Sequence, residues 1–227
     1  MHSEVFHRLG SRFVVQVFKP DCPELTVDKL HHEYAYLRTI YAELPRLIPR
    51  QRLVQPRPGA PLQACALVKD YIPHRADFAL HRVDPARLAP GTREQIARFL
   101  HITRRLLATT APRHATGTEA PMLPDIIDPD CTNLVVNVRS GDLALIDTNR
   151  LISTRKLARL AAAGQHLDPA QHRIHGLLLR RLMFLEAKYL GRTRAALRHD
   201  PVYARYVGAA GFEVLCVASA EAGEPIP

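Results

Sequence analysis

The sequence has no uninterrupted apolar run that approaches the roughly 18–20 residues a membrane-spanning helix needs. Its first residues also lack the basic-then-apolar order that is typical of a secretory signal peptide. These two absences argue against a membrane protein and against a secreted one. We therefore expect a soluble, cytoplasmic protein, with export as an effector left open.

Cysteine is sparse and widely spaced. The four cysteines, Cys22, Cys65, Cys131 and Cys216, include no C-x-x-C pair. A disulfide framework needs many cysteines in a short chain, and a cysteine zinc site needs closely spaced pairs. Neither is indicated, so we expect reduced thiols.

Lysine is the scarce basic residue. Lysine and arginine total 31 residues against 22 acidic ones, which gives a net charge of +9, yet only five of the 31 are lysines. This charge favours encounters with anions such as nucleic acid and nucleotides. The basic residues form no polybasic block, so a solvated basic surface is the plainest interpretation, and each lysine position becomes informative.

At 227 residues the chain has the length of one domain, or of one domain built as two lobes. Hydrophobic residues make up 47% and charged residues 23% of it, which is the mixture of a globular protein that buries a core. The whole chain is therefore expected to fold. We find no internal repeat.

The N-terminal third predicts a hairpin followed by a helix. Residues 4–18 form the hairpin, and the alternation of its second strand places Lys19 at the end of an apolar row that includes Val17. The helix begins at residue 26 or 28 and runs to about residue 43, with Glu33 on its apolar side. A carboxylate in that position needs a partner.

The rest of the chain predicts one more strand, a second hairpin and several helices. Residues 63–71 form a strand, and the Ile72-Pro73 step after it is the best candidate for a lobe boundary. An amphipathic helix follows over residues 92–110. The second hairpin has strands at 134–138 and 143–146, and acidic residues and an asparagine gather at its open end.

These polar residues suggest one site. A lysine that ends a strand can reach a buried glutamate on the next helix and hold its ammonium toward phosphate oxygens. Asn133 and Asp147, which flank the second hairpin, can hold Mg²⁺ through oxygen ligands. Asp128 would then orient or deprotonate an acceptor hydroxyl.

The order of strand lysine, helix glutamate, D-x-x-x-x-N, hairpin and aspartate resembles the protein-kinase-like superfamily, including its aminoglycoside-phosphotransferase branch and small bacterial relatives. The resemblance covers roughly residues 4–190. It implies an α+β, two-lobed fold, with a minimal N-terminal β-lobe over 1–73, a mainly helical lobe over 74–217 and a loose tail over 218–227.

The resemblance also implies a nucleotide site. Val15-Gln16-Val17-Phe18-Lys19 is similar to the family's V-A-I-K strand, which makes Val17 an adenine-lining residue and Lys19 the phosphate-binding lysine. Glu33 corresponds to the helix glutamate that holds this lysine. Lys69 and Tyr71 lie on the segment similar to the hinge strand, whose backbone faces the adenine edge.

The transfer machinery carries over in the same way. Asp128 corresponds to the catalytic base, and Asn133 and Asp147 to the magnesium ligands. Asp125, eight residues before Asn133, is a rival for the base. Departures are the missing G-x-G-x-x-G loop, with only Gly10 before the lysine, and the missing H-R-D histidine.

The resemblance therefore implies an ATP- and Mg²⁺-dependent phosphotransferase that acts on a hydroxyl of a protein or small molecule. One alternative is a catalytically weak pseudokinase that binds a nucleotide or a partner in the same cleft, which the missing glycine-rich loop favours. A second alternative, from another class, is a basic nucleic-acid-binding domain. No cofactor other than ATP and Mg²⁺ is implied.

Overall fold

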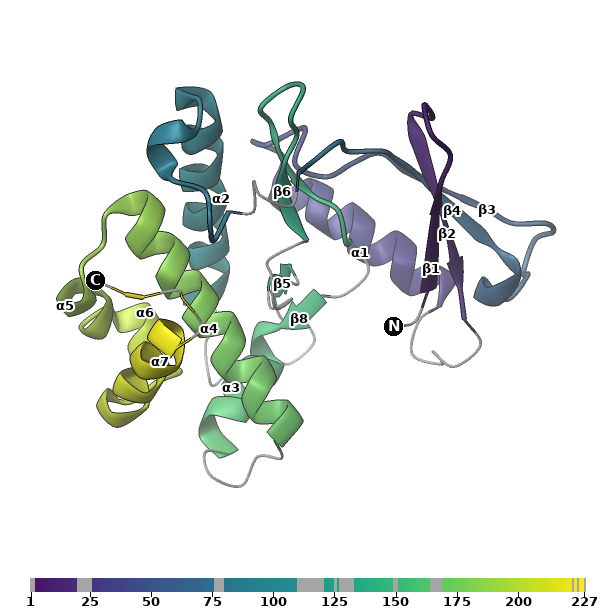
Figure 1. The fold of residues 1–227 in the computed structure, drawn as a ribbon. Coiled ribbons are helices and arrows are strands. Elements are labelled where there is room, and N and C mark those ends of the chain that lie inside the picture. The colour runs from purple at the N-terminus through teal and green to yellow at the C-terminus, as the bar shows by residue number, and fades with distance from the viewer. Residues whose placement is uncertain are drawn as a thin grey trace.

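The computed structural model of the chain describes residues 3–19, 26–75, 80–109, 121–124, 126, 133–148, 151–163, 169–221, 223 and 225–226, with the backbone alone for 169–175. Within these residues the chain is a mixed α+β protein, as expected from the sequence. A small sheet and helix α1 (Val27–Ile40) lie at one end of the molecule, and helices gather at the other (Figure 1). No described helix is both long and apolar enough to span a bilayer.

The sheet has four antiparallel strands in the order β1-β2-β4-β3. Its strands are β1 (Ser3–His7), β2 (Phe13–Phe18), β3 (Gln51–Val54) and β4 (Ala66–Asp70). The predicted first hairpin is confirmed, and Gly10 takes a positive φ of 80° in its turn, which glycine adopts without steric cost. The strand predicted over 63–71 is confirmed as β4, preceded by a short 3₁₀ turn at Leu62–Ala64.

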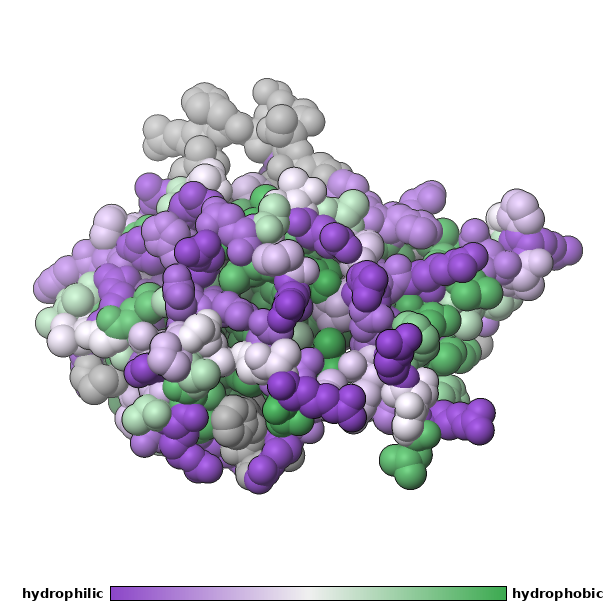
Figure 2. All heavy atoms as spheres, turned by 90° about the horizontal axis from the view of Figure 1, so that it is seen from above, coloured by the Kyte–Doolittle hydropathy of each residue, from purple (hydrophilic) through white to green (hydrophobic). Residues whose placement is uncertain are grey.

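The two faces of the sheet have different surroundings. On β2 the buried side chains are Gln16 and Phe18, and Phe18 packs with Leu30 of α1 and Leu67 of β4 in a small hydrophobic cluster. We call the face toward α1 the inner face. The outer face leaves apolar side chains such as Phe13 exposed, and apolar and polar side chains are mixed at this end of the molecular surface (Figure 2).

Helix α1 connects the two hydrophobic clusters of the molecule. It begins at Thr26, whose side chain accepts a hydrogen bond from the Lys29 backbone N–H at 3.1 Å. Its Leu30 belongs to the small cluster under the sheet, whereas Leu37 packs into the large cluster formed with the helices. Because one helix packs into both clusters, it couples the sheet to the rest of the chain.

The large cluster is built mainly by α2 (Pro90–Ala108) and α4 (Pro169–Leu190), which pack against each other. Two further strand pairs are the hairpin of β6 (Leu134–Val136) and β7 (Leu143–Leu145), and β5 (Met122–Pro124) with β8 (Leu151–Ser153). The remaining helices are the 3₁₀ turn Pro85–Arg87, α3 (Thr154–Ala163), α5 (Arg194–Arg198), α6 (Pro201–Ala204) and α7 (Ala209–Glu221).

A buried ionic cluster links three of these helical segments. Asp200, 2% exposed, lies 2.5 Å from Arg104 and 2.6 Å from Arg192, and it caps α6 by accepting a hydrogen bond from the Val202 N–H at 2.8 Å. Burial opposes ionisation, but the hydrogen bonds from Arg104 and from the backbone of Val202 outweigh it and lower the pKa of Asp200. Arg192 also binds Glu186 of α4 at 2.7 Å.

We expect Asp200→Asn to lower the free energy of unfolding by about 2–4 kcal/mol, because it leaves two arginines without their shared carboxylate. Urea unfolding measures this change. Because the pKa of Asp200 is lowered in the folded protein, its ionised carboxylate adds its full stabilisation above the unfolded pKa of about 3.9. This stabilisation is lost as the pH falls through the lower pKa of the folded protein. Glu94→Gln, at an exposed ion pair, is the control, with a change within about 0.5 kcal/mol. Equal effects of the two substitutions would contradict this account.

Candidate functional site

The open end of the β6–β7 hairpin brings Asn133 and Asp147 together. Asn133 immediately precedes β6, and Asp147 follows β7 by two residues. The Ile146 N–H donates to the Asn133 carbonyl oxygen at 2.8 Å, which continues the pairing beyond the last ladder residues. The predicted hairpin is confirmed, with both polar residues at its open end.

Three other segments hold this hairpin in place. The Leu145 N–H donates to the Leu47 carbonyl at 2.7 Å, in the loop after α1, and the Val138 N–H donates to the Pro73 carbonyl at 2.9 Å, just after β4. On the far side, the Gln95 side chain of α2 accepts from the Leu143 N–H at 2.9 Å. The position of Asp147 is therefore set by elements from both ends of the molecule.

Glu33 of α1 is buried near Asp147. The glutamate is 4% exposed, and its Oε2 atom has no hydrogen-bond partner within the described part of the chain. Burial raises the pKa of Glu33, the charge of Lys29 lowers it, and the negative charge of Asp147 raises it further. The expectation that Glu33 lies on the buried side of its helix is confirmed.

Lys69 of β4 is a buried cation near the same aspartate. It is 7% exposed, and burial lowers the pKa of its ammonium group to about 8, against the attraction of the Asp147 carboxylate, which raises it. Its neighbours across the sheet are Val14 on β2 and Gln51 on β3. Lys69 therefore lies on the inner face, the side of the sheet that α1 covers.

A hydrogen bond fixes the segment of Asp147 beneath β3. Thr148, which is buried, donates from Oγ1 to the Gln51 Oε1 atom at 2.8 Å. Because Gln51 is directly opposite Lys69, this bond places the residue after Asp147 next to the strand pair that carries the lysine. The structure thus brings Glu33, Lys69 and Asp147 into one electrostatic group, which we call the inner cluster.

Lys19 does not join this cluster, which corrects the expected Lys19–Glu33 pair. Its Nζ atom lies 3.2 Å from the Glu4 Oε1 atom, and 42% of its side chain is exposed. Glu4 is directly opposite Val17, so both it and Lys19 are on the outer face, and Val17 is also too exposed to line an inner site. The alternation of β2 was predicted correctly, but Gln16 occupies the inner face.

The other expected residues have mixed outcomes. Tyr71 lies at the end of β4, where its ring stacks on that of His7 with centroids 3.8 Å apart. Asp125 and Asp128, the two candidates for the base, lie outside the described residues. Among the described residues, no group of three or more His, Cys, Asp or Glu side chains could hold a metal ion.

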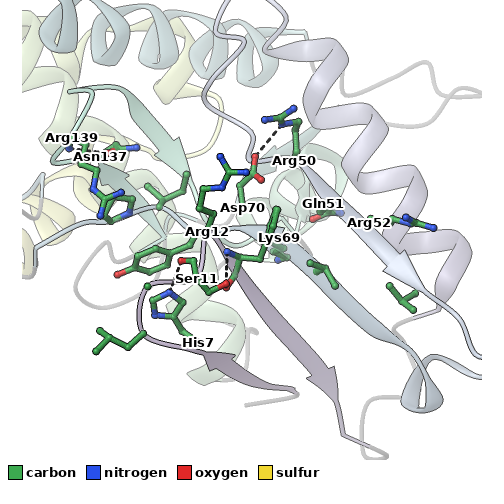
Figure 3. A pocket seen from close by; sticks show the side chains of 18 residues that line it. His7, Ser11, Arg12, Arg50, Gln51, Arg52, Lys69, Asp70, Asn137 and Arg139 are labelled. Carbon is green, nitrogen blue, oxygen red and sulfur yellow. Dashed lines mark hydrogen bonds and ion pairs between the residues drawn. The ribbon is translucent and has the colours of Figure 1, made fainter.

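A cavity of about 1040 Å³ opens beside Tyr71, between the ends of the strands and the tip of the β6–β7 hairpin (Figure 3). Its described lining is strongly basic, with Asp70 as the one acidic residue. The basic side chains are His7, Arg12, Arg50, Arg52, Lys69 and Arg139. Sequence reasoning missed the arginines because they come from separate segments and form no motif.

No protein-family model matches the chain, and no curated protein matches it. Among solved structures, the chain is similar to the choline kinase LicA from Streptococcus pneumoniae, at 14% sequence identity. The similarity covers 94% of this chain and 90% of that one, with a TM-score of 0.34. A likeness at this level establishes neither a shared activity nor a shared substrate.

The buried Oε2 atom of Glu33, which has no hydrogen-bond partner in the described part of the chain, predicts an unusual dependence of stability on pH. Its pKa is raised in the folded protein, so the folded state holds the proton more tightly than the unfolded chain. Stability should therefore fall as the pH rises above the unfolded pKa of about 4.3 toward the raised value. We expect Glu33→Gln to remove this fall and to be at least as stable as the wild type at pH 7.

Urea unfolding of both proteins between pH 4 and pH 8 measures the effect. Asp28→Asn, on the exposed side of α1, is the control, and its stability should follow that of the wild type across this range. Parallel stability curves for the wild type and Glu33→Gln would contradict the raised pKa of Glu33 in the folded protein.

Proposed function

We propose that the protein is an ATP- and Mg²⁺-dependent phosphotransferase of the protein-kinase-like type, which transfers a phosphoryl group to a hydroxyl of a small molecule or protein. The observation that carries this proposal is the inner cluster beside Asn133. It combines the buried carboxylate of Glu33, the buried ammonium group of Lys69 and the half-buried carboxylate of Asp147 at the open end of a hairpin. Phosphoryl transfer depends mainly on positioning and on neutralising phosphate charge, and both need such a group.

The residues present fit a magnesium ion. Asp147 and Asn133 offer carboxylate and amide oxygens, the hard ligands that Mg²⁺ prefers, and the Ile146–Asn133 backbone bond keeps them at one end of the hairpin. When bound, the ion would neutralise charge on the nucleotide phosphates. Glu33, buried nearby, adds to the negative field that attracts a cation.

The remaining roles follow from the order along the chain. The backbone after β4, around Tyr71, would face the adenine edge. Asp128 would accept the proton of the acceptor hydroxyl, with Asp125 as the alternative, while the hydroxyl oxygen forms a bond to the γ-phosphorus. The bond between the γ-phosphorus and the β-γ bridging oxygen breaks, and ADP leaves with that electron pair.

A pseudokinase uses the same residues to bind without turnover. The presence of Gln16, rather than a lysine, on the inner face of β2 favours this alternative. Nucleotide binding is common to both proposals, and turnover separates them.

Binding and turnover are tested with one pair of variants. At about 100 times its dissociation constant, MgATP should stabilise the wild type by about 2.7 kcal/mol, a shift of a few degrees in Tm. We expect this shift to vanish with EDTA and in Asp147→Asn, and phosphate transfer to be abolished with it. Glu43→Gln, at an exposed site on the loop after α1, should keep both. An ATP shift unaffected by EDTA and by Asp147→Asn would contradict the proposed metal site.

The arginine-lined cavity favours a second candidate function, the binding of single-stranded nucleic acid. The side chains of Arg12, Arg52 and Arg139 have no ion pair with any described residue, and the stacked His7 and Tyr71 rings lie beside them. Guanidinium groups that contact phosphates, next to aromatic rings on which bases stack, are typical of such sites.

Here the expected result is an affinity for a single-stranded oligonucleotide that falls steeply with salt. Each arginine that contacts a phosphate should contribute about 0.7 to the slope of log affinity against log salt concentration. Arg12→Ala and Arg139→Ala should each reduce the slope by about that amount, and Arg93→Ala, exposed on α2, should leave it unchanged. A slope near zero in the wild type would exclude this function.

A further inference from the structure

The inner face of β2 carries no cation. Its two buried side chains are Gln16 and Phe18, and the Gln16 amide donates to the Ser3 Oγ atom of β1 at 2.7 Å. The lysine that ends the strand, Lys19, pairs with Glu4 on the opposite face. A phosphate group placed beneath this sheet would therefore meet no positive charge from β2.

The neighbouring strand β4 supplies a positive charge, that of Lys69, instead. The inner face alternates Leu67 and Lys69, so the lysine is enclosed on the side that α1 covers. Among the described residues, Lys69 is the lysine whose side chain is buried. Lys29 lies on the exposed side of α1, and Lys188 of α4 donates to the His81 carbonyl at 2.8 Å.

The surroundings of Lys69 also connect it to the proposed metal ligand. Gln51, its partner across the strand pair, accepts the hydrogen bond from Thr148, the residue next to Asp147. The charge of the Asp147 carboxylate acts on the Lys69 ammonium group. A buried ammonium group is costly unless an opposite charge or a bound anion compensates it.

We propose that Lys69, and not Lys19, is the phosphate-binding lysine of this site, with its ammonium group facing the nucleotide phosphates and the Asp147 carboxylate. The assignment rests on the proposed phosphotransferase function. It places the site's cation one strand further along the sheet than the sequence motif indicates.

The register of the sheet suggests a rescue variant. Gln16 lies opposite Leu67, and Lys69 lies opposite Val14, so positions 16 and 69 are diagonal neighbours on the same face. Diagonal neighbours are about 7–8 Å apart, within reach of a lysine side chain. A lysine introduced at position 16 should therefore bring its ammonium group to the space that Lys69 fills.

The experiment compares MgATP-induced shifts in Tm for Lys69→Met, for Lys69→Met combined with Gln16→Lys, and for Lys19→Ala. The control is Lys156→Ala, at an exposed position on α3. We expect Lys69→Met to weaken MgATP binding at least tenfold, Gln16→Lys to restore part of it, and the other two variants to bind as the wild type does. Loss of binding in Lys19→Ala with retention in Lys69→Met would overturn the assignment. If Lys69→Met does not fold, Lys69→Arg replaces it, and binding as tight as that of the wild type would overturn the assignment.

A second measurement without nucleotide separates this assignment from the proposed function. In a double-mutant cycle, the losses in Tm caused by Lys69→Met and Asp147→Asn should be less than additive, because each removes the same electrostatic contact. Strict additivity would overturn the contact between Lys69 and Asp147. If the wild type shows no MgATP shift but the cycle is non-additive, the proposed function fails, and the assignment of phosphate binding fails with it, while the contact stands.

Discussion

The docking of the β6–β7 hairpin is the constraint on which the site depends. Backbone hydrogen bonds to Leu47 and Pro73, together with the Gln95 side chain, fasten the hairpin to the loop after α1, to the end of β4 and to α2. Such bonds exchange protein–water for protein–protein contacts and contribute only about 1 kcal/mol each, but they specify position closely. Because they converge on one short hairpin, several bonds together hold the strand that leads to Asp147.

Helix α1 completes this arrangement from the other side. It packs Leu30 beneath the sheet and Leu37 among the helices, so the position of Glu33 between them is fixed by both hydrophobic clusters. The site therefore lies where the two clusters meet. Glu33 and Lys69 are buried there, which strengthens their interactions with the neighbouring charge of Asp147 and makes an uncompensated charge costly. Structural stability alone does not require a buried carboxylate such as Glu33, whose Oε2 atom has no hydrogen-bond partner among the residues that the structure describes, and this is the physical reason for proposing a function for the cluster.

The sequence predicted the local elements well, but it did not predict that Lys19 lies on the face of the sheet away from Glu33. The two hairpins and the burial of Glu33 followed from alternation, turn residues and helical period, which are local signals. The alternation of β2 also placed Val17 and Lys19 correctly on one face. It could not tell which face meets α1, because Phe13, Val15 and Val17 form a row as apolar as the inner one. Only the tertiary packing of α1 decides this. The burial of Lys69 could have been inferred from its place two residues after Leu67 in an apolar strand.

The most direct test of this account is a crystal structure of the protein with Mg²⁺ and a non-hydrolysable ATP analogue. We expect the metal ion on Asp147 and Asn133, and a phosphate oxygen within hydrogen-bond distance, about 3 Å, of the Lys69 Nζ atom. The adenine should lie against the backbone near Tyr71. A nucleotide whose phosphates contact Lys19 on the outer face, or the arginines of the cavity without contacting Lys69, would contradict phosphate binding by the inner cluster.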